Sequence, residues 1–315
     1  MSLRLIRCHN TTSTRNGRTV ISPIALWPPL VGLALFAAGL FIVRREVSAN
    51  QGIDKLIATA GPLYAAPLAV FGTEHLIAAR SIMLMVPVWM PFRLFWAYFV
   101  GIALIAAALS IVFRKYVWLS ASLLAAMVFL FVLLIHVPNA VKQPDSRLFW
   151  TLVLRETAFA CGALALAATK MKERSAMAST AMIFISRSAI AITLLFFALQ
   201  HFLHPEFASG VPLEKITPPW VPFTRFWGYL VGAVLLIAGT TLPFRKLTRI
   251  AATWVGVVML LLTIGLYLPI YLMASGTSAL VEGVNYVADT MLFAGAVLLL
   301  AAASPRGSAA QPASD

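Results

Sequence analysis

Charged residues are scarce in this chain. They make up 11% of its 315 residues, whereas 61% are hydrophobic, and soluble domains contain about a quarter charged residues. The charges fall mostly in short stretches between long apolar runs. Because apolar runs of ~20 residues match the hydrocarbon thickness of a bilayer, this pattern excludes an ordinary soluble domain. The sequence predicts an all-α fold, a polytopic transmembrane helical bundle whose first partner is the lipid bilayer.

Cysteine is also rare, and several catalytic motifs are absent. Cys8 lies in a polar N-terminal segment and Cys161 in an apolar run, where we expect it to pack as a small residue. The lack of C-x-x-C excludes a self-contained dithiol exchange centre. No G-x-S-x-G, P-loop or Rossmann glycine pattern occurs. His201-x-x-His204 has a spacing that a metal site can use, but the first half of the chain has no second histidine there, and we predict no metal site.

Acidic residues are outnumbered, with 11 Asp and Glu against 24 Lys and Arg and a net charge of +13. No basic helix with interleaved aromatics lies outside the apolar runs, so we expect no nucleic-acid partner. Twelve basic residues fall in loops of one side: Arg44, Arg45, Lys55, Arg114, Lys115, Lys170, Lys172, Arg174, Arg245, Lys246, Arg249 and Arg306. Six fall on the other: Arg80, Arg93, Lys142, Arg147, Lys215 and Arg225. The positive-inside tendency predicts that the first side is cytoplasmic.

Nine apolar segments predict nine transmembrane helices, at about residues 24–43, 55–79, 93–112, 116–137, 148–168, 181–203, 225–243, 247–271 and 283–303. A polar linker near the middle divides them. The predicted organisation is a flexible basic tail (1–20), an extra N-terminal span (21–50), a first four-helix unit (51–168), the linker (169–180), a second four-helix unit (181–303) and a flexible tail (304–315).

The division into two units follows from an aromatic string that occurs twice. VWMPFRLFWAYFVG at 88–101 and PWVPFTRFWGYLVG at 219–232 are identical at eight of fourteen positions, 131 residues apart. The match extends upstream to Glu74-His75 and Gln200-His201 at an offset of 126, and downstream to Glu156-Thr157 and Asp289-Thr290 at 133. Four spans per unit insert both copies in the same orientation, so the sequence predicts two parallel four-helix repeats plus one extra N-terminal span.

The string itself has two interpretations. Trp and Tyr prefer the headgroup level of a membrane, which favours an interfacial anchor that also packs the bundle. Phe92, Phe95, Trp96 and Phe99 fall on one helical face, which favours a lining for a lipid-soluble aromatic ligand. The residues predicted to bind such a cofactor are Trp96, Tyr98, Trp227, Tyr229 and Tyr267.

Ionisable residues within apolar spans are costly and mark candidate sites. The predicted topology places a layer of them toward the extracytoplasmic side, and the predicted catalytic residues are Glu74, His75, His136, Glu156, His201 and Asp289. A carboxylate beside an imidazole can hold or relay a proton, as quinone chemistry requires. The alternative is an interhelical hydrogen-bond network that only fixes packing.

The layout resembles the DoxX family. The residues behind the resemblance are Glu74-His75, Trp89-x-Pro91-Phe92, Phe95-Trp96-x-Tyr98-x-x-Gly101, Arg114-Lys115 and Glu156, with their second copies. Many members have an acidic residue after the glycine, where this chain has Ile102-Ala103 and Ala233-Val234. The resemblance implies a multi-pass protein of the bacterial inner membrane, with quinone as the cofactor, a redox protein as the partner and a role as a subunit of a quinone-linked oxidoreductase. The alternatives are a carrier or receptor for a small hydrophobic molecule or protein cargo, without catalysis, and a structural assembly subunit.

Overall fold

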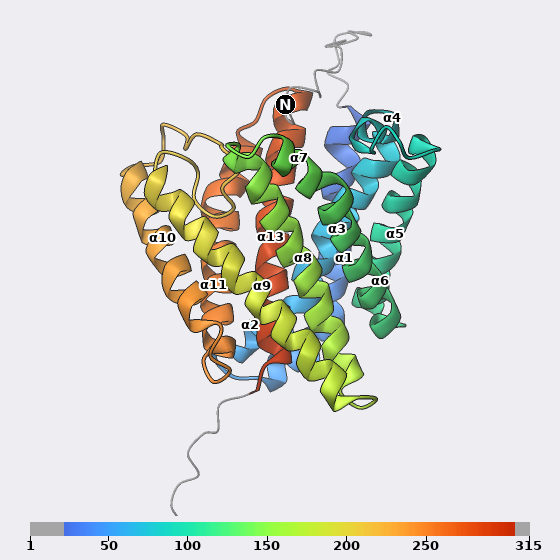
Figure 1. Cartoon of the computed structure of the whole chain (residues 1–315), viewed down its shortest axis with the longest axis vertical. Helices are drawn as coiled ribbons and strands as arrows, with labels where there is room; N and C mark the ends of the chain where they lie inside the picture. The colour runs from blue at the N-terminus through green and yellow to red at the C-terminus, as the bar shows by residue number, and fades with distance from the viewer. Residues whose placement is uncertain (1–21, 306–315) are drawn as a thin grey trace, which may run out of the picture.

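The computed structural model describes residues 22–305, and every regular element in that range is helical. The long helices are α1 (Pro23–Ala49), α3 (Ala60–Ile77), α5 (Arg93–Phe113), α6 (Val117–Phe131), α8 (Arg147–Met171), α9 (Ala176–Leu203), α10 (Thr224–Thr241), α11 (Thr248–Leu262) and α13 (Thr277–Ala303) (Figure 1). Short elements connect them: α2 (Asp54–Ala58), α4 (Ala79–Ile82), α7 (Val137–Lys142), α12 (Leu268–Leu272), the 3₁₀ turn η1 (Met83–Met85) and the π-helical turns η2 (Val132–His136) and η3 (Thr263–Tyr267).

Within residues 22–305, seven helices are long and apolar enough to cross a membrane, or eight if the bent pair Ala60–Ile77 and Ala79–Met85 is one span. These helices confirm the predicted all-α polytopic bundle. The seventh predicted span, 225–243, corresponds to α10, an 18-residue helix that is not among them. The predicted tails lie outside the described residues, apart from Ser304 and Pro305.

The second predicted span, 55–79, is not one straight helix. The chain forms α2, breaks at Thr59, continues as α3 and bends by 90° into α4. The bend comes just before Arg80, which is exposed. Because an arginine side chain is costly in hydrocarbon, the chain turns along the surface at this point instead of extending the span.

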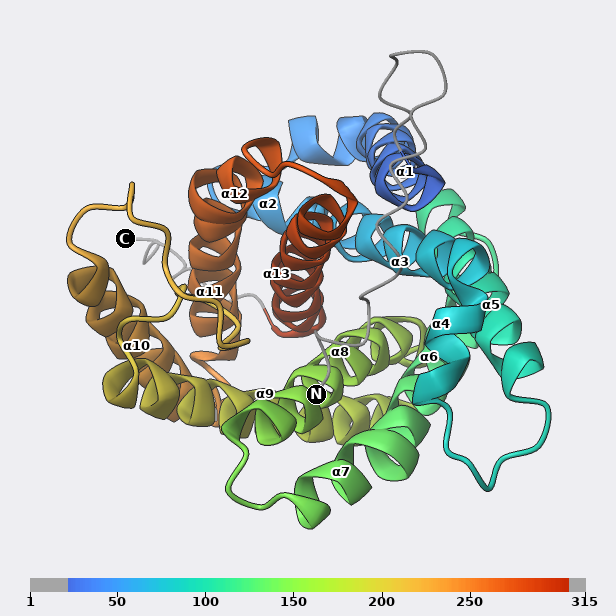
Figure 2. The same cartoon turned by 90° about the horizontal axis from the view of Figure 1, so that it is seen from above.

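The helix contacts repeat in the two halves of the chain. In the first, α3 packs against α5 and α6 against α8; in the second, α9 packs against α10 and α11 against α13. The halves meet through α8 with α9 and through α13 with α3, and α8 crosses α13 near the middle of the bundle (Figure 2). Helix α1 lies outside this arrangement, against α3.

Local backbone features repeat as well. The π-helical turns η2 and η3 are 131 residues apart and each precedes a helix with proline at its second position, Pro138 or Pro269. Proline removes one backbone donor and its ring displaces the carbonyl four residues earlier, and a π-turn accommodates that displacement within a continuous span. Phe92 and Phe223, which precede α5 and α10, both adopt left-handed backbone angles.

Ion pairs join helices and their connections at each end of the bundle. At one end, called the basic end, Arg114 pairs with Glu46, and Arg249 Nη2 donates to Asp54 Oδ1 at 2.6 Å. At the other, called the outer end, Lys215 Nζ lies 2.8 Å from Glu282 Oε1. Helices of alternating direction bring the loops with most of the basic residues to the basic end (Figure 1), as the sequence predicts. That this end is cytoplasmic stays a prediction.

Candidate functional site

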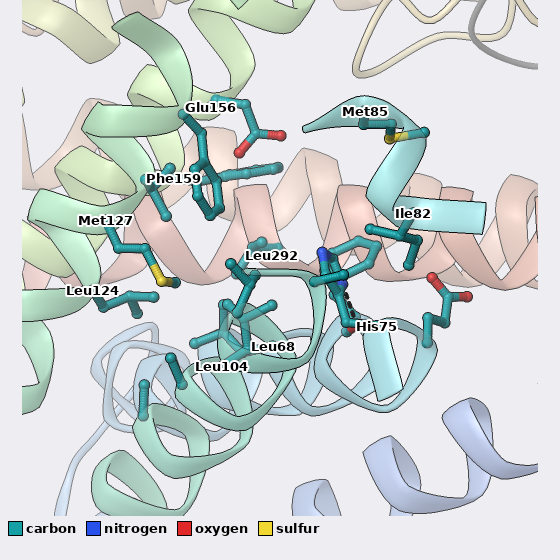
Figure 3. A pocket seen from close by; sticks show the side chains of 18 of the residues that line it. Leu68, His75, Ile82, Met85, Leu104, Leu124, Met127, Glu156, Phe159 and Leu292 are labelled. Atoms are coloured by element: carbon teal, nitrogen blue, oxygen red, sulfur yellow. Dashed lines mark hydrogen bonds between the residues drawn. The ribbon is translucent and has the colours of Figure 1, made fainter. Parts of the chain in front are cut away.

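A cavity of about 2050 Å³ lies within the first half of the bundle. Its walls come from α3, α5, α6 and α8 of that half and from α13 of the second, and residues of α4 and η1 cover its outer end. His75 and Glu156 are directed into this space from α3 and α8, and Leu104, Met127 and Leu292 form part of its apolar wall (Figure 3). We call it the first-unit cavity.

The polar wall of the cavity is centred on Arg155. Its Nη1 donates to Asp289 Oδ2 at 2.8 Å and its Nη2 donates to Glu156 Oε1 at 2.7 Å. All three side chains are at most 16% exposed. Glu156 and Asp289 occupy corresponding positions of the two repeats, so a single arginine joins the equivalent carboxylates of both halves, which lie on α8 and α13.

Three more predicted residues line the same end of the cavity. Glu74 is buried, and its Oε1 has no hydrogen-bond partner among the described residues. The next residue, His75, places Nδ1 2.8 Å from the carbonyl oxygen of Phe71. His136 ends the π-turn η2 and lies in the cavity wall. The polar end therefore brings together Glu74, His75, His136, Glu156 and Asp289, with Arg155.

The remainder of the cavity is an apolar groove between α5 and α6. It reaches Ser110, Lys115 and Ser120 near the basic end. Several residues that line it have exposed side chains, namely Phe99, Leu109, Leu119, Leu123 and Leu130. The groove is thus exposed along α5 and α6 for much of its length, while α3, α8, α13 and α4 contribute to its polar end.

The corresponding space in the second half is filled by protein. The connection from α9 to α10, residues 204–223, is five residues longer than the connection from α3 to α5, residues 78–92. Residues 208–213 of this longer connection are buried without interruption, whereas none of residues 80–92 is buried. We call residues 208–213 the inserted loop. Its last residue, Leu213, also forms part of the wall of the first-unit cavity.

The inserted loop is held by two of the predicted site residues. The backbone N–H of Gly210 donates to His201 Nε2 at 2.9 Å, and the Tyr267 hydroxyl donates to the carbonyl oxygen of Ser209 at 2.8 Å. Arg147 pairs with Glu214 at 3.0 Å and lies over the ring of Phe207. His201 and Tyr267 are therefore occupied by the protein's own backbone, unlike their counterparts in the first half.

Replacing Gly210 by alanine should release this loop. Gly210 has φ of +118°, and a Cβ there would lie 3.3 Å from Leu262 Cδ1. We expect Gly210→Ala to lower the free energy of unfolding by about 1–3 kcal/mol and to speed hydrogen exchange of residues 204–217. Gly265→Ala is the control, because no heavy atom lies within 4 Å of its Cβ position. Equal thermal unfolding midpoints and loop exchange rates in the two variants would contradict the role of Gly210.

The predicted cofactor-binding aromatics mostly lie elsewhere. Trp96 lines the cavity, and its indole Nε1 donates to the carbonyl of Pro91 at 3.0 Å. Trp227 repeats this bond with Pro222 but is outside the cavity wall, as are the exposed Tyr98 and Tyr229. The first-turn tryptophan thus anchors the proline-rich approach to each helix.

Two placements differ from the expected symmetry of the site. Two equivalent repeats predict a separate polar group in each unit, yet Asp289 of the second repeat lies in the first-unit cavity with Arg155 and Glu156. Arg155 itself was not among the predicted site residues. An arginine within an apolar span is as unusual as the carboxylates, and Ala288 stands at the matching position of the second repeat, so a comparison of the repeats for differences would have singled it out.

The geometry suits an amphiphilic ligand. Carboxyl and imidazole groups at one end can form hydrogen bonds or exchange protons, and the apolar groove can receive a long hydrocarbon chain. Within residues 22–305, no group of three or more His, Cys, Asp or Glu side chains is placed to hold a metal ion. His204 lies 3.5 Å from Glu206, and His201 is engaged by the inserted loop.

Sequence and structure comparisons find no known protein that is similar to this chain. No family model, no curated protein and no solved structure matches the chain. The site is therefore interpreted from its own residues, and the family resemblance remains a prediction. What the chain itself establishes is a multi-pass helical membrane protein with a polar-ended cavity in one of two similar halves.

Proposed function

We propose that this protein binds a quinone-like lipid in the first-unit cavity and acts as a membrane subunit that presents this ligand to a redox partner. The observation that supports it is the division of one cavity into a polar end and an apolar groove. A quinone has the same division, with a polar ring that exchanges protons and a long hydrocarbon tail. The resemblance to the DoxX family, with its quinone-linked members, agrees with the proposal.

The dimensions of the cavity also support a lipid over a compact metabolite. Sites for drug-sized molecules measure about 300–1,000 Å³, and the first-unit cavity is about 2050 Å³. Its lateral opening between α5 and α6 would let a ligand enter from the hydrocarbon phase. The polar ends of Glu74, His75 and Glu156 would then meet the ring at the outer end of the groove.

A carrier or receptor for a small hydrophobic molecule, without catalysis, is the second candidate. The observation that favours it is the length of the groove, which continues to Lys115 and Ser120 near the basic end. A pathway along the span would serve transfer of a lipid from one end of the bundle to the other. Two results together would favour this candidate: the purified protein retains a hydrophobic ligand, and Glu74→Gln leaves the redox turnover of the host membrane unchanged.

A cavity-filling substitution tests the proposed function. Ala103 lines the groove from α5, and Val234 occupies the matching position of α10 outside the cavity wall. We expect Ala103→Phe to reduce the quinone retained per protein by about tenfold through steric overlap, whereas Val234→Phe should retain the wild-type amount. The measurement is mass spectrometry of lipids extracted after purification in mild detergent. Wild-type protein without quinone, or equal quinone in both variants, would refute the proposal.

A further inference from the structure

The inserted loop of the second half shows what kind of chemical group this site architecture holds. The carbonyl of Ser209 and the N–H of Gly210 belong to the same peptide unit. Tyr267 donates to the oxygen of that unit at 2.8 Å, and His201 accepts from its nitrogen at 2.9 Å. A small planar group is therefore bound through a hydrogen-bond donor on one edge and an acceptor on the other.

The first half presents the same two positions to open space. His75 corresponds to His201 at the offset of 126, and His136 corresponds to Tyr267 at the offset of 131. Both lie in the wall of the first-unit cavity. His201 is 4% exposed, whereas His75 is only partly buried because its outward edge borders the cavity.

The hydrogen bond to the helix backbone determines the tautomer of each histidine. His75 Nδ1 lies 2.8 Å from the carbonyl of Phe71, and His201 Nδ1 lies 2.6 Å from the carbonyl of Phe197. A carbonyl oxygen only accepts, so Nδ1 must have the proton, and Nε2 of the neutral ring is then an acceptor. In the second half, His201 Nε2 accepts a hydrogen bond from the Gly210 N–H, which agrees with this assignment.

An acceptor at His75 Nε2 discriminates between the two redox forms of a quinone. A quinol offers a hydroxyl that donates to Nε2. A quinone offers a carbonyl oxygen, which places lone pair against lone pair and leaves a desolvated acceptor without a partner. His136 has a shorter side chain than Tyr267, so it leaves room for a ring where the second half holds a peptide unit.

We propose that the first-unit cavity selects the reduced, hydroxylated form of its lipid-soluble ligand, with His75 Nε2 accepting a hydrogen bond from the ligand hydroxyl. This inference rests on the proposed function, because it names the form of the ligand that the same cavity binds. His75 is a specificity-determining residue, and the helix carbonyl of Phe71 fixes its acceptor edge. The expected preference for quinol over quinone is about tenfold.

The test compares a decyl-substituted benzoquinone with its quinol on the full-length protein in lipid nanodiscs under anaerobic conditions. Wild-type protein should bind the quinol about tenfold more tightly, which raises the midpoint potential of the bound couple by ~30 mV for two electrons. His75→Gln places an amide near Nε2 that can donate or accept, so the two affinities should become equal. His75→Asn places an amide near the position of Nδ1, where it can bond to the Phe71 carbonyl, but no group near the position of Nε2. This variant should therefore bind the quinol more weakly than wild-type protein and bind the quinone equally well.

The outcomes separate this inference from the function on which it rests. Failure of both probes to bind wild-type protein would refute the proposed function. Equal affinities in wild-type protein would overturn the selection of the reduced form while leaving ligand binding intact. A tenfold preference that persists in both His75 variants would also overturn it, because the discrimination would then come from another residue. Loss of the preference in the folded variants supports it.

Discussion

Substituting Arg155 by methionine should lower the free energy of unfolding by about 3–5 kcal/mol, the typical effect of removing one partner from a buried ion pair. Arg155 is the cation between Asp289 and Glu156, at 2.8 and 2.7 Å. Without it, two carboxyl groups remain within a transmembrane bundle with no positive charge bonded to them. The midpoint of thermal unfolding in detergent should fall by roughly 5–15 °C for a chain of this size.

Two further variants show whether charge compensation is the cause. Arg155→Lys keeps the charge but cannot form both bonds in the same geometry, so we expect an intermediate loss of stability. The triple variant Arg155→Met, Glu156→Gln and Asp289→Asn removes all three charges and should recover most of the loss, because replacing a complete buried ionic group is often nearly neutral. If the triple variant is as unstable as Arg155→Met alone, packing around the arginine is the cause and the electrostatic explanation is wrong.

Gly295→Ala should destabilise the contact between the two halves of the bundle. A Cβ at residue 295 would lie 2.6 Å from the backbone nitrogen of Tyr64 and 2.7 Å from its Cα. Backbone atoms cannot rotate away as a side chain can, so α13 and α3 would have to separate. We expect the free energy of unfolding to fall by about 1–3 kcal/mol, as for other overpacked interiors. We also expect faster cleavage in limited proteolysis, because the two halves would separate more readily.

Gly61→Ala is the matched control, since it is a glycine-to-alanine change in α3, three residues before Tyr64, that faces α5 instead of α13. Its Cβ would meet only Ile111 Cγ2, at an ordinary distance of 3.7 Å. Alanine is the better helix former, so this variant should be neutral or slightly stabilising. Equal unfolding midpoints for Gly295→Ala and Gly61→Ala would show that α3 and α13 can adjust their separation, contrary to the tight crossing described above.

The buried aromatic and polar contacts of Tyr64 show why that crossing matters for the cavity. Its hydroxyl donates to the carbonyl of Phe159 on α8 at 2.6 Å, and Tyr64 also lines the cavity wall. The α3 backbone that approaches Gly295 therefore also positions α8, on which Arg155 and Glu156 lie. A shift of α3 at this crossing would change the polar end of the cavity as well as the stability of the bundle.

Much of the secondary structure followed from the sequence because apolar run lengths and repeats are local properties. The helices α5, α8 and α10 lie within a few residues of the predicted spans, and α9 and α13 end at the predicted residue but begin five and six residues earlier. The offset of 131 recurs in the π-turns and in the left-handed Phe92 and Phe223. The predicted span 55–79 ends where α3 bends into α4, but the break at Thr59 was missed because a continuous apolar window averages over the single residue at which a helix is interrupted.

The polar residues of the site were recognised from their cost in hydrocarbon, but their grouping was not. Glu74, His75, His136 and Glu156 line one cavity as a set. His201 and Tyr267 instead hold the inserted loop, because five additional residues between α9 and α10 occupy the space that stays open in the first half. Sequence similarity between the repeats predicts equivalent positions, and it does not report whether a neighbouring loop folds outward or inward.

By itself, the sequence determined that this protein is a helical membrane bundle of two related halves with ionisable residues in its spans, since composition, run length and periodicity specify these features directly. Only the tertiary structure decided that one half contains an open cavity and the other does not. Packing across the centre brings Asp289 to Arg155 and Glu156, and the inserted loop fills one site while leaving the other open. These are contacts between residues far apart in the chain, and they depend on which surfaces meet when the two halves pack together.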